Sequence, residues 1–88
     1  MPAVYQARQL AARAQTAQET ALARALFEEG VVAADAQRWD EAAERFERAY
    51  GLKATPGIAY NWASALVELG RLVEAGERLR SVARFTSG

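Results

Sequence analysis

Apolar residues recur along this chain at intervals of three or four positions, and no segment alternates with a period of two. This spacing places them on one face of an α-helix, so the pattern predicts helices and no strand. Residues 3 to about 36 consist mostly of strong helix formers, with Gly30 as the one breaker. Up to Ala21 the apolar stripe is narrow, with Leu10 as its only leucine. We therefore predict a long Ala-rich N-terminal helix that forms by propensity more than by burial.

A second helix is predicted after a short break at Gln37-Arg38. It starts near Asp40, because an aspartate carboxylate can accept hydrogen bonds from the free N–H groups of a first helical turn. Phe46 and several alanines form its apolar stripe. Gly51 is expected at its C-terminal cap, a position that glycine favours.

The third helix has the clearest start signal in the chain. Thr55 suits the N-cap, and Pro56 suits the first helical position because its φ is preset and its missing N–H is not needed there. This helix runs to about Leu69, and Gly70-Arg71 separates it from a fourth helix that begins near Leu72. Four helices and no strand predict an all-α fold.

The predicted helices recur as pairs. Asp40-Glu41-Ala42 aligns with Val73-Glu74-Ala75. We name the spacing from Ala42 to Ala75 the repeat offset, and two residues separated by it are called equivalent. At the repeat offset large and small positions largely coincide: Phe27 with Tyr60, Gly30 with Ala63, Ala33 with Leu66, Gln37 with Gly70, Trp39 with Leu72, Phe46 with Leu79, and Ala49 with Val82. A period of about 34 residues with two helices per unit is typical of one class of helical-repeat protein.

These residues resemble those of the tetratricopeptide repeat (TPR) family. The run Trp39-Asp40-Glu41-Ala42, followed by Phe46 and Ala49, is similar to the family's second helix, and Asn61-Trp62-Ala63 is similar to its first helix. The resemblance covers about residues 23–84 and implies an α-solenoid of antiparallel helix–turn–helix units. An ordinary four-helix bundle is the alternative. The implied divisions are an N-terminal helical arm at 1–21, TPR-like units at 22–55 and 56–85, and a tail at 86–88.

Three positions depart from the family pattern. Glu29 stands where an apolar residue is usual, and Gln37 replaces the turn glycine. Pro56 falls two residues later than the usual proline between repeats. These departures concern how tightly the first unit packs.

The resemblance also implies a peptide-binding groove, because the first helix of each TPR unit lines a concave surface. Asn61 matches the asparagine with which chaperone-binding members hold a peptide carboxylate, but Phe27 and Val31 replace its polar companions, so such a clamp is not expected. An apolar, partly aromatic groove is favoured instead, with packing of the aromatic rings against neighbouring helices as the alternative. The groove positions implied for this chain are Arg24, Phe27, Val31, Tyr60, Asn61, Ser64 and Glu68.

Composition excludes most catalytic chemistry. The chain of 88 residues has no histidine, no cysteine and a formal net charge of zero. The usual zinc ligands and the commonest general base are therefore absent, and we predict no catalytic residue, no metal site and no cofactor. The neutral charge argues against a nucleic-acid partner. Glu41 with Arg45, and Glu44 with Arg48, are expected as solvated ion pairs four residues apart.

The predicted function is that of a non-enzymatic adaptor, which binds a protein or peptide in the apolar groove. The alternative is a self-assembling scaffold, because Leu79, Val82 and Phe85 lie on the last helix with no polar capping helix after them. The N-terminal arm, exchanged between protomers, is the other route to such self-assembly. No apolar run reaches the length of a membrane span, so the cytoplasm is the default localisation. Ala12-Arg13-Ala14-Gln15 resembles a signal cleavage site and makes export the alternative.

Overall fold

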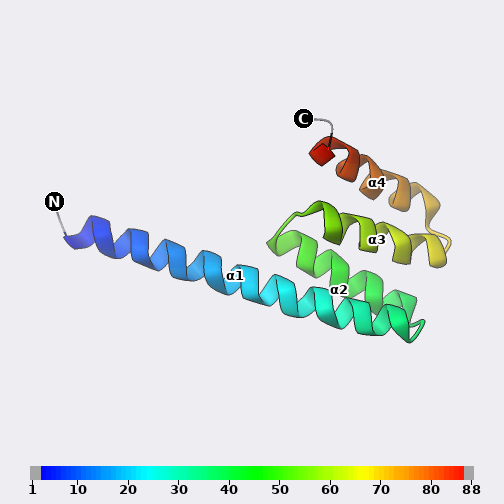
Figure 1. The fold of residues 1–88 in the computed structure, drawn as a ribbon, viewed down its shortest axis with the longest axis horizontal. Coiled ribbons are helices and arrows are strands. Elements are labelled where there is room, and N and C mark those ends of the chain that lie inside the picture. The colour runs from blue at the N-terminus through cyan, green and yellow to red at the C-terminus, as the bar shows by residue number, and fades with distance from the viewer. Residues whose placement is uncertain (1–2, 87–88) are drawn as a thin grey trace.

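The computed structural model describes the backbone of residues 3–86 and the side chains of residues 6–84. This part of the chain forms α1 (Ala3–Asp35), α2 (Trp39–Leu52), α3 (Pro56–Glu68) and α4 (Leu72–Thr86), joined by short turns (Figure 1). The described residues contain no strand, which confirms the predicted all-α fold.

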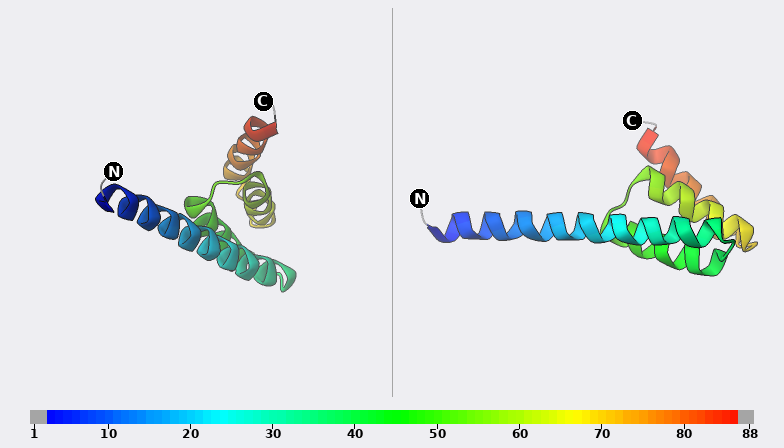
Figure 2. Two further views of the ribbon diagram at one scale, coloured as in Figure 1. Left: turned by 60° about the vertical axis from the view of Figure 1, so that its left-hand side comes forward. Right: turned by 60° about the horizontal axis from the view of Figure 1, so that its bottom comes forward.

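Consecutive helices run antiparallel and pack side by side, α1 with α2, α2 with α3, and α3 with α4 (Figure 1). The C-terminal half of α1 takes part in this packing. Its N-terminal part projects away from the other helices (Figure 2). From here on the arm means residues 3–19, which lie within the arm predicted at 1–21 and precede Thr20, the first described side chain of α1 that is partly buried. Every described side chain of the arm is exposed. The arm accounts for a radius of gyration of 16.1 Å, against about 12 Å for a compact chain of this length.

The start of α3 agrees with its sequence signal. Thr55 is the N-cap, and its Oγ1 accepts a hydrogen bond from the N–H of Ile58 at 3.2 Å. Pro56 occupies the first helical position, where no backbone hydrogen bond is lost. The start of α2 lies at Trp39, one residue before the expected Asp40.

The expectation that Gly51 caps α2 is wrong. The helix continues through Gly51 to Leu52, and the N–H of Lys53 still bonds the carbonyl of Ala49 at 2.9 Å. The physical reason is the partial burial of Leu52, which packs against the cluster of Leu26, Ala49 and Ile58. Lys53 then turns into an extended conformation that leads directly to the N-cap of α3.

The core consists of small residues around two large side chains. Phe46 and Leu66 are the largest fully buried side chains of the described residues, and they share a cluster with several alanines. Gly30 lies directly against the Phe46 ring, since a Cβ at position 30 would stand 2.5 Å from Cε1 of that ring. The small residue at position 30 therefore lets α1 and α2 approach closely.

The α1–α2 turn and the α3–α4 turn are built alike. Gln37 and Gly70 adopt positive φ angles of 62° and 76°. In each turn this residue donates to the carbonyl three residues back, and the next residue donates to the carbonyl five residues back, which is a Schellman motif. The four bonds run from Gln37 to Ala34, Arg38 to Ala33, Gly70 to Val67 and Arg71 to Leu66, at 2.8–2.9 Å. The repeat offset that relates the two sequences thus also relates their turns.

We expect Gln37→Gly to raise the free energy of unfolding by about 0.5–1 kcal/mol, since a side chain in the left-handed region costs roughly 1–2 kcal/mol and the added chain entropy of glycine offsets part of that gain. Gly70→Ala is the matched change in the second turn and should lower stability by about 1 kcal/mol. Urea unfolding followed by circular dichroism measures both. A loss of stability in Gln37→Gly would contradict the strain argument.

Candidate functional site

A hollow of about 320 Å³ lies between α1 and the segment that leads into α3. We name it the α1–α3 groove. It is formed where α2 ends and the chain crosses back toward α1, so residues far apart in the sequence share it. Its lining residues are Thr20, Ala23, Arg24, Phe27, Lys53, Thr55, Gly57 and Ile58.

The floor of the α1–α3 groove is apolar. Ala23 and Ile58 are buried, at 3% and 8% exposure, and Phe27 is half-buried. The Phe27 ring also packs on the Phe46 ring, with centroids 5.5 Å apart. Phe27 therefore packs in the core with one side and lines the groove with another.

The charges at the α1–α3 groove are of one sign. Arg24 and Lys53 are exposed and line it, and no carboxylate of the described residues does. Within residues 6–84 neither cation forms an ion pair. In the same range other arginines do pair with glutamates: Arg38, Arg45, Arg48, Arg71 and Arg78. The groove thus combines an apolar floor with two cations that are available to an anionic ligand.

The residues predicted for one groove lie at two places. Arg24 and Phe27 line the α1–α3 groove. A second hollow, of about 290 Å³, lies on α3 and α4, and we name it the α3–α4 face. Its lining residues are Tyr60, Ala63, Ser64, Val67, Glu68 and Leu79, which include three of the predicted groove positions and one predicted self-association position.

The remaining predicted positions have local roles or lie outside the described side chains. Val31 is half-buried and packs against the main core cluster. Asn61 donates through Nδ2 to the Gly57 carbonyl at 2.8 Å. Val82 is half-buried, and the side chain of Phe85 lies outside the described residues.

Sequence reasoning missed Lys53, Thr55 and Ile58 as groove residues. Thr55 was predicted only as the N-cap of the third helix, and the periodicity of a helix carries no information about which other helix its end approaches. The link between α2 and α3 is extended at Lys53, and it brings Lys53 and Ile58 back beside α1. A prediction of that extended link would have been the signal for these groove residues.

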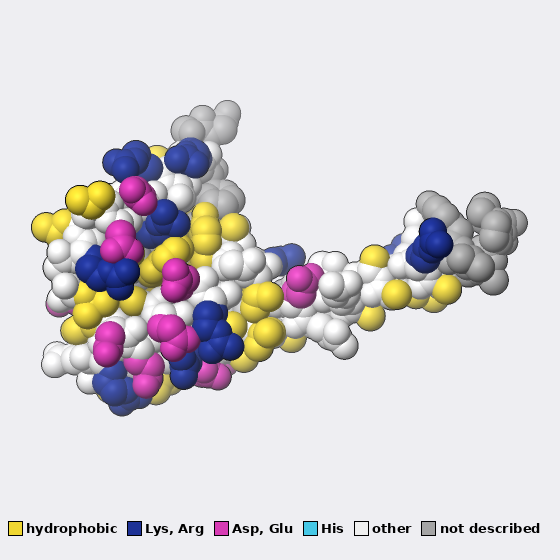
Figure 3. All heavy atoms as spheres, turned by 180° about the vertical axis from the view of Figure 1, so that it is seen from behind, with side chains coloured by type: hydrophobic (Ala, Val, Ile, Leu, Met, Phe, Trp, Pro, Cys, Tyr) yellow, Lys and Arg dark blue, Asp and Glu magenta, His cyan; other side chains and the backbone are white. Residues whose placement is uncertain are grey.

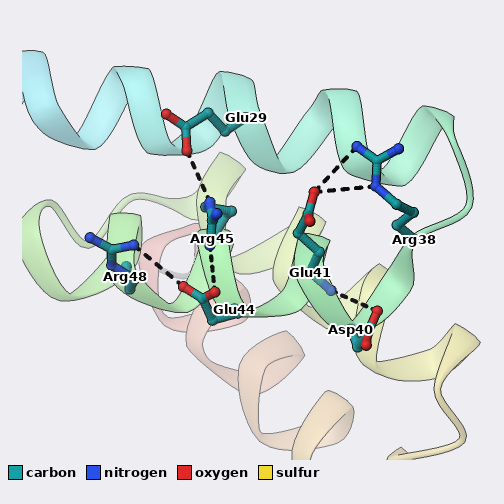
Figure 4. A network of polar contacts seen from close by, with 7 residues as sticks. All are labelled: Glu29, Arg38, Asp40, Glu41, Glu44, Arg45 and Arg48. Atoms are coloured by element: carbon teal, nitrogen blue, oxygen red, sulfur yellow. Dashed lines mark hydrogen bonds and ion pairs between the residues drawn. The ribbon is translucent and has the colours of Figure 1, made fainter.

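A polar network joins α1 to α2 at a separate place (Figure 4). Arg45 on α2 donates through Nε to Glu29 on α1 at 2.9 Å, and it also pairs with Glu44. The hydrogen bonds to Glu44 and then to Glu29 raise the pKa of Arg45 above its ordinary value. Glu29 on α1 is thus paired with a cation of α2 across the interface between these helices.

One of the two ion pairs expected on α2 is wrong. Glu44 pairs with Arg48 at 3.4 Å as expected, but Glu41 pairs with Arg38 at 3.2 Å and not with Arg45. The reason is Glu29, which draws the Arg45 guanidinium toward α1 (Figure 4). Helix spacing alone cannot predict that choice.

Among the described side chains no charged or polar residue is buried, and no group of three or more acidic, histidine or cysteine residues is placed to hold a metal ion. No helix in the described part of the chain is both long and apolar enough to cross a bilayer. Comparison of the chain with protein-family models, with curated proteins and with solved structures gives no match.

Proposed function

We propose that this chain is a non-enzymatic peptide-binding protein of the TPR type, and that its α1–α3 groove holds an acidic, partly apolar segment of another polypeptide. The observation that carries the proposal concerns the described residues of the groove: an apolar floor, two cations without an ion pair, Arg24 and Lys53, and no carboxylate in the lining. A site with this composition has the chemistry to bind and lacks the chemistry to catalyse.

The TPR character is supported by side chains as well as by the two turns. Arg38 pairs with Glu41 at the start of α2, and Arg71 pairs with Glu74 at the same place on α4. The second pair is bidentate, with bonds of 2.8 and 2.7 Å, and it lowers the pKa of Glu74. The repeat offset that relates the turns also relates these two pairs.

A second pair of equivalent contacts supports the same interpretation. Arg45 reaches Glu29 in the first unit, while its equivalent Arg78 lies over the Trp62 ring, 4.6 Å from the centroid. Glu29 and Trp62 are themselves related by the repeat offset. The same two positions thus join the helices of both units, once by an ion pair and once by a cation–π contact.

The absence of catalytic groups from the described side chains favours binding over catalysis. An active site usually holds titratable groups whose pKa values are shifted by burial and by charged neighbours in a cleft. In the α1–α3 groove the titratable side chains of the described lining are exposed cations, and the hydroxyls serve the backbone or its caps. Thr55 caps α3, and Thr20 donates to the Thr16 carbonyl at 2.9 Å.

The ligand chemistry follows from the lining. An apolar side chain fills the hollow against Phe27 and Ile58, and carboxylates beside it meet Arg24 and Lys53. Because both cations are exposed, they contribute more to selectivity and association rate than to affinity, and salt screens them. We therefore expect binding that weakens as ionic strength rises.

Selection from a phage-displayed library of random peptides tests this function. We expect the full chain to enrich peptides that combine Asp or Glu with Leu, Ile or Phe. A selected peptide, labelled with fluorescein, should bind at least about tenfold more weakly to Arg24→Glu/Lys53→Glu, since two attractive charges become repulsive.

The matched control is Arg80→Glu/Arg84→Glu, which reverses two exposed charges on α4 that do not line the groove. It should bind the selected peptide as the unmodified chain does. Enrichment of no peptide, or equal loss in both double variants, would rule out the groove as the binding site.

A further inference from the structure

The α3–α4 face is an apolar surface that no described residue covers. Tyr60, Val67 and Leu79 line it and are 58%, 47% and 44% exposed. Three large side chains around one hollow differ from apolar residues scattered singly over a surface, which need no explanation. Such a gathering marks a place where another element packs.

The first helix pair, α1 and α2, shows how the equivalent surface is covered when another helix packs on it. At the repeat offset Leu79 corresponds to Phe46, which is 1% exposed, and Tyr60 and Val67 correspond to Phe27 and Ala34, which are half-buried. Those first-pair residues belong to, or pack against, a cluster that α3 joins through Ala65 and Leu66. A helix therefore closes the surface of the first pair, and within the described chain the second pair lacks its equivalent.

The arm is a helix that packs on no other element of the described chain. Its described side chains, residues 6–19, are all exposed, and Figure 3 shows hydrophobic side chains along its length. Leu10 is 62% exposed and is flanked by alanines on one side of the helix. The arm spans about 25 Å, and α3 spans about 20 Å. In length and in its small apolar residues the arm therefore resembles the helix that covers the first pair.

The arm of one molecule cannot cover its own α3–α4 face. α1 is one continuous helix from Ala3 to Asp35, so the arm continues its axis away from α3 and α4 (Figures 1 and 2). Folding the arm back would break the helix where no glycine or proline interrupts it, between the arm and Gly30. An arm that covers this face must come from a second copy of the chain.

Charge decides which of the two hollows the arm fits. Arg8 and Arg13 are the charged residues of the arm before Glu19, and within the described part of the chain neither forms an ion pair. Glu68 is the charged residue of the α3–α4 face and is likewise unpaired among the described side chains. The α1–α3 groove carries two cations and repels a basic arm. The α3–α4 face attracts it.

We propose that the chain self-associates, with the arm of one copy packing as a helix on the α3–α4 face of another, as α3 packs on the first helix pair. Leu10 of the arm meets the apolar surface around Leu79, and Arg13 or Arg8 pairs with Glu68. The α3–α4 face shares no lining residue with the α1–α3 groove, so substitutions at this face test self-association separately from peptide binding.

Sedimentation equilibrium of the full chain over a range of concentrations tests the proposal. We expect concentration-dependent association for the unmodified chain, and a dissociation constant raised at least about tenfold in Leu10→Glu and in Leu79→Glu, since each buries an unpaired carboxylate in the contact. Both sites are exposed in the single molecule, so helix content by circular dichroism should not change. Val73→Glu is the matched control, because Val73 is 78% exposed on α4 outside the face.

A charge exchange separates this contact from any other. Arg13→Glu and Glu68→Arg should each weaken association, and the double variant should recover most of the loss, because the pair is restored in reverse. A chain that stays monomeric at every concentration overturns the proposal, and so does association that Leu79→Glu leaves unchanged.

Discussion

Gly30→Ala is expected to lower the free energy of unfolding by about 2–3 kcal/mol, although alanine is the better helix former. The added Cβ would stand 2.5 Å from Cε1 and 2.7 Å from Cδ1 of Phe46. The Phe46 ring is 1% exposed and enclosed by the core cluster, so it cannot swing into solvent. Overpacking of this kind costs about 1–3 kcal/mol, and here α1 and α2 must also separate.

Gly51→Ala is the matched control for this prediction. Gly51 also lies within a helix, but nothing lies within 4 Å of a Cβ built at that position. The same substitution should therefore stabilise the chain by about 0.5 kcal/mol through helix propensity alone. Guanidinium unfolding of both variants measures the difference in sign. Equal effects at the two glycines would show that packing against Phe46 is not what selects glycine at position 30.

These two glycines show what the sequence could predict and what it could not. The repeat offset identified Gly30 as a small position within a helix, and that is how the structure uses it. Local preference gave Gly51 a capping role, because glycine is favoured at helix ends. Leu52, the next residue, packs against the cluster that contains Leu26 of α1 and Ile58 of α3, and this packing overrode the preference. Contacts between segments so far apart in the sequence cannot be predicted from local preference.

The turns show a second limit. Gln37 aligned with Gly70, so the position of the turn could be predicted, but its left-handed conformation in Gln37 could not. Glutamine has no preference for positive φ. The conformation is imposed by the two hydrogen bonds that close the Schellman motif, and these form because α2 must return along α1.

The candidate site was predictable only in part for a related reason. The resemblance to the TPR family implied Arg24 and Phe27 on α1, and Tyr60, Ser64 and Glu68 on α3, as two faces of one groove. Whether the two faces join depends on the rotation of α3 about its axis relative to α1, which packing of Leu66 and Ile58 decides. In the structure the two faces line separate hollows, and the loop residue Lys53 takes a place at the first.

Phe46→Ala is expected to have the largest effect of any single substitution, a loss of about 3–5 kcal/mol. The ring is fully buried, packs on Phe27 and fills the space beside Gly30, and the surrounding residues are mostly alanines too short to close the gap. A chain of this length has a stability of roughly 4–13 kcal/mol, so this loss is a large fraction of the total and should lower the denaturation midpoint in proportion. Val73→Ala, at a side chain 78% exposed, should cost less than about 0.5 kcal/mol.

The two large predictions are coupled, and a double-mutant cycle measures the coupling. Without the Phe46 ring the extra Cβ of Gly30→Ala meets empty space, so the substitution should no longer destabilise and should recover up to about 1 kcal/mol of helix propensity. Phe46→Leu provides a milder background if Phe46→Ala is too unstable to measure. Chemical denaturation of the two single variants and the double variant gives the interaction free energy, which we expect to be about 2–4 kcal/mol. Additive losses would mean that Gly30 is required for a reason other than contact with Phe46, and the close approach of α1 to α2 would then need another cause.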